Sequence, residues 1–162
     1  MTIKIGDKVP ESTLMTMTDE GPRPVRTADL FGGKKVVLFA LPGAFTPTCS
    51  NQHAPGFIRH AADIKARGVD TIACLSVNDA FVMGAWGDQL GADNKVMMLA
   101  DGNGDFTKSL GLDFDGSSFG MGVRSQRYAM LVEDGVMKTL HLEPNPGEAH
   151  ASGAEAMLEA LG

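Results

Sequence analysis

The sequence contains little cysteine: only two of its 162 residues, Cys49 and Cys74, carry a thiol. Two cysteines are too few for the disulfide framework that stabilises many small secreted domains. The first residues, MTIKIGD, contain no apolar run of the kind found in a signal peptide. We therefore expect a reducing, cytoplasmic location, unless a targeting segment has been removed from the chain.

The sequence also lacks an excess of positive charge and long apolar runs. Its net charge is −6 at pH 7, and no basic stripe runs along it. Nucleic-acid binding needs concentrated lysine and arginine, so no nucleic-acid partner is expected. No stretch approaches the roughly eighteen apolar residues that a membrane-spanning helix needs, so no membrane association is expected either.

What the sequence does contain is the composition of a globular domain. Hydrophobic residues make up 43% of the chain and charged residues 21%, which is typical of such domains. A chain of this length can bury a core without disulfides or metals. No internal repeat, low-complexity tract or linker interrupts it, so residues 1–162 are predicted to form a single domain.

Predicted strands and helices alternate along the chain. Short apolar runs predict three buried strands, at 35–41, 69–77 and 96–100. Capping residues and spacing predict four helices, at 47–67, 79–90, 105–110 and 153–161. Pro55 and Gly56 should kink or split the first helix, Gly68 should end it, and Asn78 or Asp79 should cap the second.

A hairpin follows the alternating part of the chain. Its strands are predicted at 128–133 and 136–142, joined by Asp134-Gly135, a pair typical of tight turns. The element order predicts an α/β sandwich with a mixed central sheet. We expect parallel strands in the middle of that sheet, a C-terminal antiparallel hairpin, and helices on both faces.

Cys49 lies where the first predicted strand passes into the first helix, in the stretch LPGAFTPTCSNQH. Pro47 suits the first helical position, which makes Thr46 the N-cap and Cys49 the third helical residue. Unpaired backbone N–H groups and the positive end of the helix dipole favour the nucleophilic thiolate there. The alternative is that Cys49 is a small buried apolar residue and Thr46 only a helix cap.

Pro42, Thr46 and Cys49 resemble the active-site signature of the peroxiredoxin family, in which Pro, three residues, Thr and two residues precede Cys. Further stretches are similar to its type II (peroxiredoxin-five) subgroup: FTPTCSNQHAPGF, CLSVNDAFVMGAW and GVRSQRYAMLVEDG. The similarity runs in order along nearly the whole chain. It implies a thioredoxin-like fold and a thiol-dependent peroxidase that reduces hydrogen peroxide and small organic hydroperoxides. It also implies that the enzyme needs no metal or other cofactor and forms a homodimer.

The resemblance also implies roles for particular residues. Cys49 corresponds to the peroxidatic cysteine, Thr46 to the residue that hydrogen-bonds the peroxide and the sulfur, and Pro42 to the residue that shields the thiolate. The activating arginine corresponds to Arg127, which directly precedes an aromatic residue, with Arg124 as the alternative. A guanidinium beside the sulfur favours the thiolate and offers two parallel donors to peroxide oxygens. The product on Cys49 would be a sulfenic acid.

Two routes could return the sulfenic acid to the thiol. Cys74 could resolve it, which would require its Cα atom to come within about 7 Å of that of Cys49. Cys74 is alternatively a buried strand residue in a continuously apolar run. The C-terminal loop, where other relatives carry a resolving cysteine, has none in PNPGEAHASGAEAM. We therefore expect a one-Cys-like cycle, with glutathione and glutaredoxin, or thioredoxin, as the external reductant.

Two other functions compete with this interpretation. A thioredoxin- or glutaredoxin-like disulfide oxidoreductase would share the fold, but the sequence has no Cys-x-x-Cys, and VRSQRY lacks that family's proline. A redox-responsive binding protein would use Cys49 as a sensor without turnover, which only kinetics can distinguish. His53 lies four residues after Cys49, on the same helix face. We interpret it as a structural or solvent-facing residue, with tuning of the thiolate as the alternative.

Overall fold

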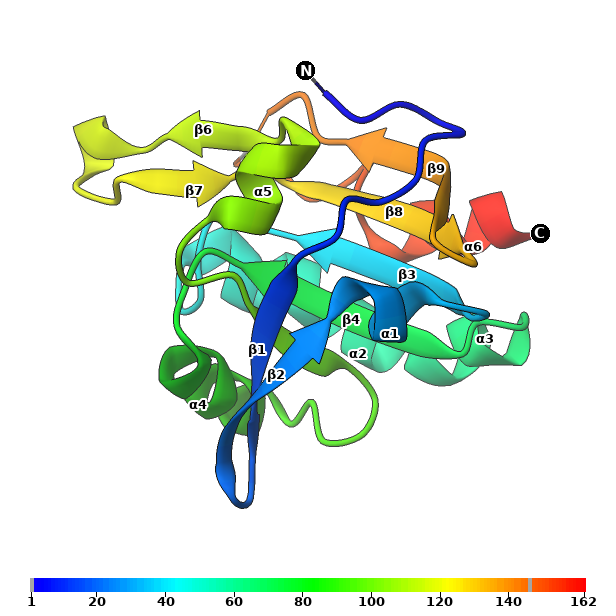
Figure 1. The fold of residues 1–162 in the computed structure, drawn as a ribbon, viewed down its shortest axis with the longest axis horizontal. Helices are drawn as coiled ribbons and strands as arrows, with labels where there is room; N and C mark the ends of the chain where they lie inside the picture. Colours follow the sequence, from blue (N-terminus) through cyan, green and yellow to red (C-terminus); the bar gives the residue numbers. More distant parts are fainter. Residues whose placement is uncertain (1, 146) are drawn as a thin grey trace.

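The computed structural model describes residues 2–145 and 147–162. A seven-stranded sheet runs through its centre in the order β2-β1-β5-β4-β3-β8-β9 (Figure 1). Three strands of this sheet pair in parallel, namely β3 (Lys35–Ala40), β4 (Thr71–Ser76) and β5 (Met97–Ala100). Two antiparallel strands extend it beyond β3, namely β8 (Tyr128–Glu133) and β9 (Val136–Leu142). The predicted mixed sheet, with a parallel middle and a C-terminal hairpin, is confirmed.

Strand β3 is apolar along its length because helices cover both faces of the sheet. On one face, Val37 and Phe39 pack in a cluster with residues of four helices, namely α2 (Ala54–Arg59), α3 (Ala61–Ala66), α4 (Ala80–Leu90) and α6 (Ala154–Leu161). On the other face, Val36 and Leu38 pack with α1 (Thr27–Phe31) and α5 (Asp105–Leu110). Successive side chains of a strand point to opposite faces, so this one strand contributes to two cores. In Figure 1, α1 and α5 lie in front of the sheet, and α2 and α3 lie behind it.

The stretch 47–67, predicted as one helix, folds as consecutive helical pieces. It includes the π-helix η1 (Cys49–His53), followed by α2 and α3. Pro55 lies in the first turn of α2, where its missing N–H is tolerated, so the predicted kink takes the form of a change from π to α winding. The break between α2 and α3 falls instead at His60, with φ −96° and ψ 9°. Gly68, with φ +92°, ends the stretch as predicted.

Two hairpins lie outside the elements that the sequence predicts. The first is made of β1 (Thr13–Thr18) and β2 (Gly21–Arg26). Two prolines make the sequence of β2 resemble a loop, and they are tolerated there because β2 is an edge strand of the sheet. The second is made of β6 (Asp113–Asp115) and β7 (Val123–Ser125), with the short 3-10 helix η2 (Ser117–Phe119) between them. It forms a separate two-stranded sheet, which extends to the left in Figure 1.

Local signals are accurate elsewhere in the chain. Asp134 and Gly135 have φ values of +48° and +78°, the left-handed conformation that a tight hairpin turn requires. Asp79 caps α4, because its carboxylate accepts from the N–H of Val82 at 2.8 Å. Within the described part of the chain, every helix is too short or too polar to cross a bilayer.

Candidate active site

The helix start holds Cys49 as the sequence predicts. The N–H of Ser50 donates to the carbonyl of Thr46 at 2.9 Å, which makes Thr46 the N-cap and Cys49 the third residue of the helical stretch. The hydroxyl of Thr46 donates to the carbonyl oxygen of Gly43 at 2.7 Å, and so ties the helix start to the preceding turn. Between them, Phe45 has a φ of +65°, a left-handed conformation that residues with side chains rarely adopt.

Arg127 brings its guanidinium to the sulfur. Its Nη2 donates to Sγ of Cys49 at 3.2 Å, and the two residues are only 3% and 0% exposed. The register between β3 and β8 explains this contact. Ala40 pairs with Tyr128, so the residue before β8 lies next to the end of β3 and the helix start that follows it. The guanidinium is permanently charged, so it stabilises negative charge on the enclosed sulfur.

The alternative arginine, Arg124, lies nearby but contacts backbone. Its Nε donates to the carbonyl of Met121 at 2.9 Å, and its Nη1 donates to the carbonyl of Pro42 at 3.4 Å. Pro42 itself is buried. Arg124 therefore holds the turn that precedes the helix, whereas Arg127 contacts the sulfur.

His53 is part of this network and is 1% exposed, so of the two expected placements, structural or solvent-facing, the solvent-facing one is wrong. Its Nδ1 lies 3.0 Å from Nη1 of Arg127, and its Nε2 lies 2.9 Å from the carbonyl oxygen of Ser152. A guanidinium only donates and a carbonyl only accepts, so Nδ1 accepts, Nε2–H donates, and the ring is neutral. Burial, together with the charge of Arg127, lowers the pKa of His53 from 6.5 to about 3.

The C-terminal segment supports His53 from behind. The Glu143 carboxylate accepts from the N–H and hydroxyl of Ser152 at 2.9 and 2.8 Å, and from the N–H of Ala151 at 3.4 Å. Burial alone would raise the pKa of Glu143. The hydrogen bonds from these two residues and the nearby His150 reverse the effect and lower it. Sequence interpretation did not identify Glu143 or Ser152, which lie far along the chain from Cys49 and carry no motif.

Cys74 lies on β4, opposite Phe39 of β3, and is completely buried. Both cysteines are free thiols and belong to the same apolar cluster. Burial raises the pKa of Cys74 well above its ordinary value, and the neighbouring Cys49 adds to that rise. Cys74 is therefore held in the poorly nucleophilic thiol form.

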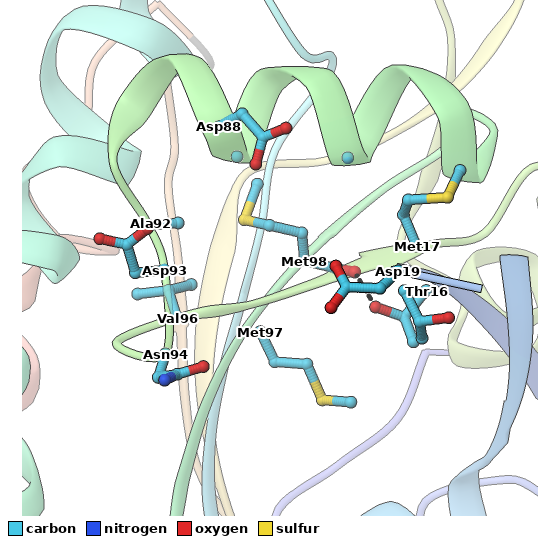
Figure 2. Close-up of a pocket in the computed structure, with 13 residues that line it drawn as sticks. Thr16, Met17, Asp19, Asp88, Ala92, Asp93, Asn94, Val96, Met97 and Met98 are labelled. Carbon is cyan, nitrogen blue, oxygen red and sulfur yellow. Dashed lines mark hydrogen bonds between the residues drawn. The ribbon is translucent and has the colours of Figure 1, made fainter. Parts of the chain in front are cut away.

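A separate cavity of about 480 Å³ lies between α4 and strands β1 and β5 (Figure 2). Its walls include the acidic side chains of Asp19, Asp88 and Asp93. Helix α4 approaches the sheet closely here, because a Cβ atom added at Gly87 would come within 2.8 Å of the Met98 side chain. Among the described residues, neither Cys49 nor Arg127, which hydrogen-bonds its sulfur, lines this cavity.

An α/β sandwich of this topology, with a buried thiol held at a helix start against a guanidinium, defines a class of thiol-based redox proteins. The Redoxin family profile matches residues 4–158. The chain is 52% identical to the chloroplastic Peroxiredoxin-2E of Arabidopsis thaliana, over 99% of this chain and 70% of that protein. It is 47% identical to Peroxiredoxin-2C of Oryza sativa subsp. japonica, over 98% of both chains.

Solved structures agree with these sequence relatives. Reduced Prx3 of Vibrio vulnificus in complex with hydrogen peroxide is 52% identical and superposes with a TM-score of 0.94, over 99% of this chain and 100% of that one. Oxidised Prx3 superposes with a TM-score of 0.89, at 53% identity, over 98% of this chain and 99% of that one. The chain belongs to the peroxiredoxin family and is a thiol-dependent peroxidase with the thioredoxin-like fold. The family resemblance of the sequence is thereby confirmed.

The relatives also correct one prediction. The expected cytoplasmic location is contradicted, because two relatives with 52% and 53% identity, from Arabidopsis thaliana and Oryza sativa subsp. japonica, are chloroplastic peroxiredoxins. The prediction rested on the lack of a visible targeting segment, and that lack carries no information about compartment when such segments are removed from mature proteins.

Proposed function

We propose that this peroxidase uses Cys49 as its peroxidatic thiolate, with Thr46, Arg127 and Pro42 as the groups that serve it. The observation that carries the proposal is the 3.2 Å hydrogen bond from Nη2 of Arg127 to Sγ of Cys49 within a buried site. Only a thiolate is a good sulfur nucleophile, and a guanidinium in direct contact favours that form.

The chemistry balances as a two-electron displacement. The Cys49 thiolate attacks one peroxide oxygen, the O–O bond breaks, and the sulfur becomes a sulfenic acid. The departing oxygen takes up one proton, equal to the one that the Cys49 thiol released on ionisation, and leaves as water, or as an alcohol when the substrate is an organic hydroperoxide. Negative charge moves from sulfur to that oxygen during the step, and Arg127 stays beside it throughout.

Thr46 and Pro42 orient the peroxide and enclose it. The Thr46 hydroxyl already donates its hydrogen to Gly43, so its oxygen is left to accept a hydrogen bond from the peroxide O–H. That bond would direct the peroxide oxygen towards the sulfur. Pro42 has no backbone N–H, and its buried ring keeps water from the thiolate.

We propose that an external thiol resolves the sulfenic acid. The thiol sulfur attacks Cys49, water leaves, and a second thiol then reduces the mixed disulfide. Glutathione with glutaredoxin, or thioredoxin, would supply these thiols. The burial of Cys74 and its raised pKa support this route over an internal disulfide.

We also propose a homodimer, and no metal or other cofactor. The chain exposes the apolar side chains of Phe45, Phe81 and Phe119, at 48%, 68% and 79%, and this apolar area supports a second copy that covers part of it. Sedimentation at micromolar concentration is expected to give twice the mass of 17.1 kDa. A monomer would contradict the dimer.

Peroxide consumption tests the proposed cycle. We expect wild-type protein to remove hydrogen peroxide catalytically with glutathione and glutaredoxin, or with thioredoxin, and Cys49→Ser to remove none above background. A metal chelator should leave the rate unchanged. Equal turnover by Cys49→Ser would overturn the assignment of Cys49. Oxidation of wild-type Cys49 without turnover by either reductant would favour a sensor.

A further inference from the structure

A closed ring of hydrogen bonds runs from Arg127 through the C-terminal segment and back to Arg127. Its side chain donates to His53, His53 donates to the Ser152 carbonyl, and the Ser152 N–H and hydroxyl donate to Glu143. The backbone N–H of Glu143 then donates to the carbonyl of Arg127 at 2.9 Å. The two ends of one arginine are thus linked through three residues, His53, Ser152 and Glu143, which we call the clasp.

We propose that Glu143 and His53 are positioning residues, through which the C-terminal segment sets where the Arg127 guanidinium stands relative to Cys49. The proposal rests on the function proposed above for Cys49 and Arg127. An arginine side chain has several rotatable bonds, and holding it at one place costs conformational entropy. The clasp supplies the fixed acceptor, Nδ1 of His53, that holds Nη1 while Nη2 faces the sulfur.

The burial of the clasp supports a positioning role over a purely space-filling one. His53, Ser152 and Glu143 are 1%, 0% and 7% exposed. A buried carboxylate costs free energy unless it is paired or hydrogen-bonded, so an apolar residue would fill this space at lower cost. The carboxylate instead accepts hydrogen bonds that fix the position of the backbone beside it. It binds the backbone of residues 151 and 152, and thereby fixes the Ser152 carbonyl that accepts from His53.

Within this closed set of hydrogen bonds, the His53 imidazole can take only one tautomer. The ring nitrogens lie between an obligatory donor, Arg127, and an obligatory acceptor, the Ser152 carbonyl. If that carbonyl moves, Nε2–H loses its partner, and the imidazole no longer holds Nδ1 at a fixed place for the guanidinium. A displacement of about 1 Å in a positioning group can cost on the order of 10² in rate.

Matched substitutions in the C-terminal segment test the role of Glu143. Glu143→Ala removes the buried carboxylate, and Glu148→Ala removes an exposed carboxylate five positions later in the same segment. Two rates are measured at high pH, where each has reached its plateau. One is capture of hydrogen peroxide, followed by fluorescence of the only tryptophan, Trp86, whose N–H binds Ser50 beside Cys49. The other is alkylation of Cys49 by iodoacetamide, which needs the thiolate but no peroxide-orienting guanidinium.

We expect Glu143→Ala to slow peroxide capture by about tenfold to a hundredfold and to leave the alkylation plateau within about twofold. Glu148→Ala should match wild type in both rates. Equal peroxide rates in the two variants would overturn the proposal, and so would a parallel loss of both rates in Glu143→Ala. If wild type itself captured no peroxide, the proposed function would fail first, so the two failures are distinguishable.

Rescue at His53 provides the second test. A glutamine amide offers one acceptor and one donor, as the neutral imidazole does, whereas leucine offers neither. We expect His53→Leu to slow peroxide capture about a hundredfold and His53→Gln to recover most of that loss. Both variants must unfold cooperatively, as checked by circular dichroism. If His53→Gln captured peroxide as slowly as His53→Leu, the imidazole would act by its shape alone, and the positioning role would be overturned.

Discussion

The two thiols of this chain share one apolar cluster and the same complete burial, yet their surroundings differ in charge. Cys49 stands at a helix start with a guanidinium at 3.2 Å. Cys74 lies within a central parallel strand, where burial and the neighbouring Cys49 raise its pKa. Exposure therefore does not distinguish the thiol that we propose to be reactive from the other one. The nearest charge and the backbone around each sulfur do distinguish them.

Removing each thiol gives the largest contrast. Cys49→Ser should lose peroxidase activity by several orders of magnitude, because a hydroxyl cannot replace the thiolate as nucleophile. Cys74→Ala should keep activity with an external reductant. Steady-state peroxide consumption measures both. A large loss in Cys74→Ala, with a Cys49–Cys74 disulfide in wild type, would mean that resolution is internal.

Removing the Arg127 guanidinium takes away the charge that distinguishes the surroundings of Cys49 from those of Cys74. Arg127→Ala should slow peroxide capture by about 10²–10³, the usual cost of losing one donor that stabilises developing charge. Arg127→Lys should recover only part of this, because a lysine has no fork of parallel donors. Stopped-flow Trp86 fluorescence measures the rate.

Arg124→Ala is the control for that experiment. Its guanidinium contacts the carbonyl of Pro42, and its removal should cost less than the removal of Arg127. If Arg124→Ala proved the slower variant, the two arginines would have to exchange roles.

The pH dependence of the free energy of unfolding tests whether burial and the charge of Arg127 keep His53 neutral. The unfolded chain protonates this histidine below pH 6.5, whereas the folded chain leaves it neutral down to about pH 3. Because the unfolded state binds the extra proton, the free energy of unfolding should fall as the pH is lowered through this range. The slope contributed by His53 is about 1.4 kcal/mol per pH unit.

Urea unfolding of wild type and His53→Gln between pH 7 and pH 4 isolates that slope. Glutamine does not titrate, so the variant should lose less stability on acidification than wild type does. Curves that ran parallel across the range would show that His53 is not held neutral by burial and Arg127.

The smallest effect is expected at Cys74 in the folded state. Cys74→Ala removes one buried sulfur and should lower the free energy of unfolding by about 1 kcal/mol, since it deletes a group of roughly methyl size. Chemical denaturation measures that loss. Native Cys74 should also resist alkylation until the chain unfolds. Rapid alkylation of Cys74 in the folded protein would contradict its assignment as an inert core residue.

Local patterns predict the middle of the fold and the place of Cys49. Strands β3, β4, β5, β8 and β9 follow from short apolar runs and the Asp134-Gly135 turn, and the helix start follows from Pro47. Hairpin β1–β2 does not follow, because prolines in an edge strand resemble a loop. The π winding of η1 also has no local signature in this sequence, since π-helices are rare and depend on packing.

The candidate site, like the fold, is only partly predictable from the sequence. The position of Cys49 at a helix N-terminus can be argued from the residues alone, whereas Arg127 is identified only by family resemblance. The clasp depends on contacts between residues 99 apart in sequence, His53 and Ser152. The spacing of four between Cys49 and His53 hinted at a shared helix face, but it gave no means to identify the Ser152 carbonyl or the Glu143 carboxylate as partners.

The oxidation state of both cysteines, determined by mass spectrometry in one sample, tests the central claim most directly. The protein receives sub-stoichiometric hydrogen peroxide in the presence of excess low-molecular-weight thiol, is alkylated rapidly, and is analysed by intact and peptide mass. The account predicts that Cys49 captures the oxidant despite the competitor, as a sulfenic acid or a mixed disulfide, and that Cys74 stays reduced. Peroxide consumed by the free thiol, with Cys49 left reduced, would contradict the claim that the helix start and Arg127 activate this thiol.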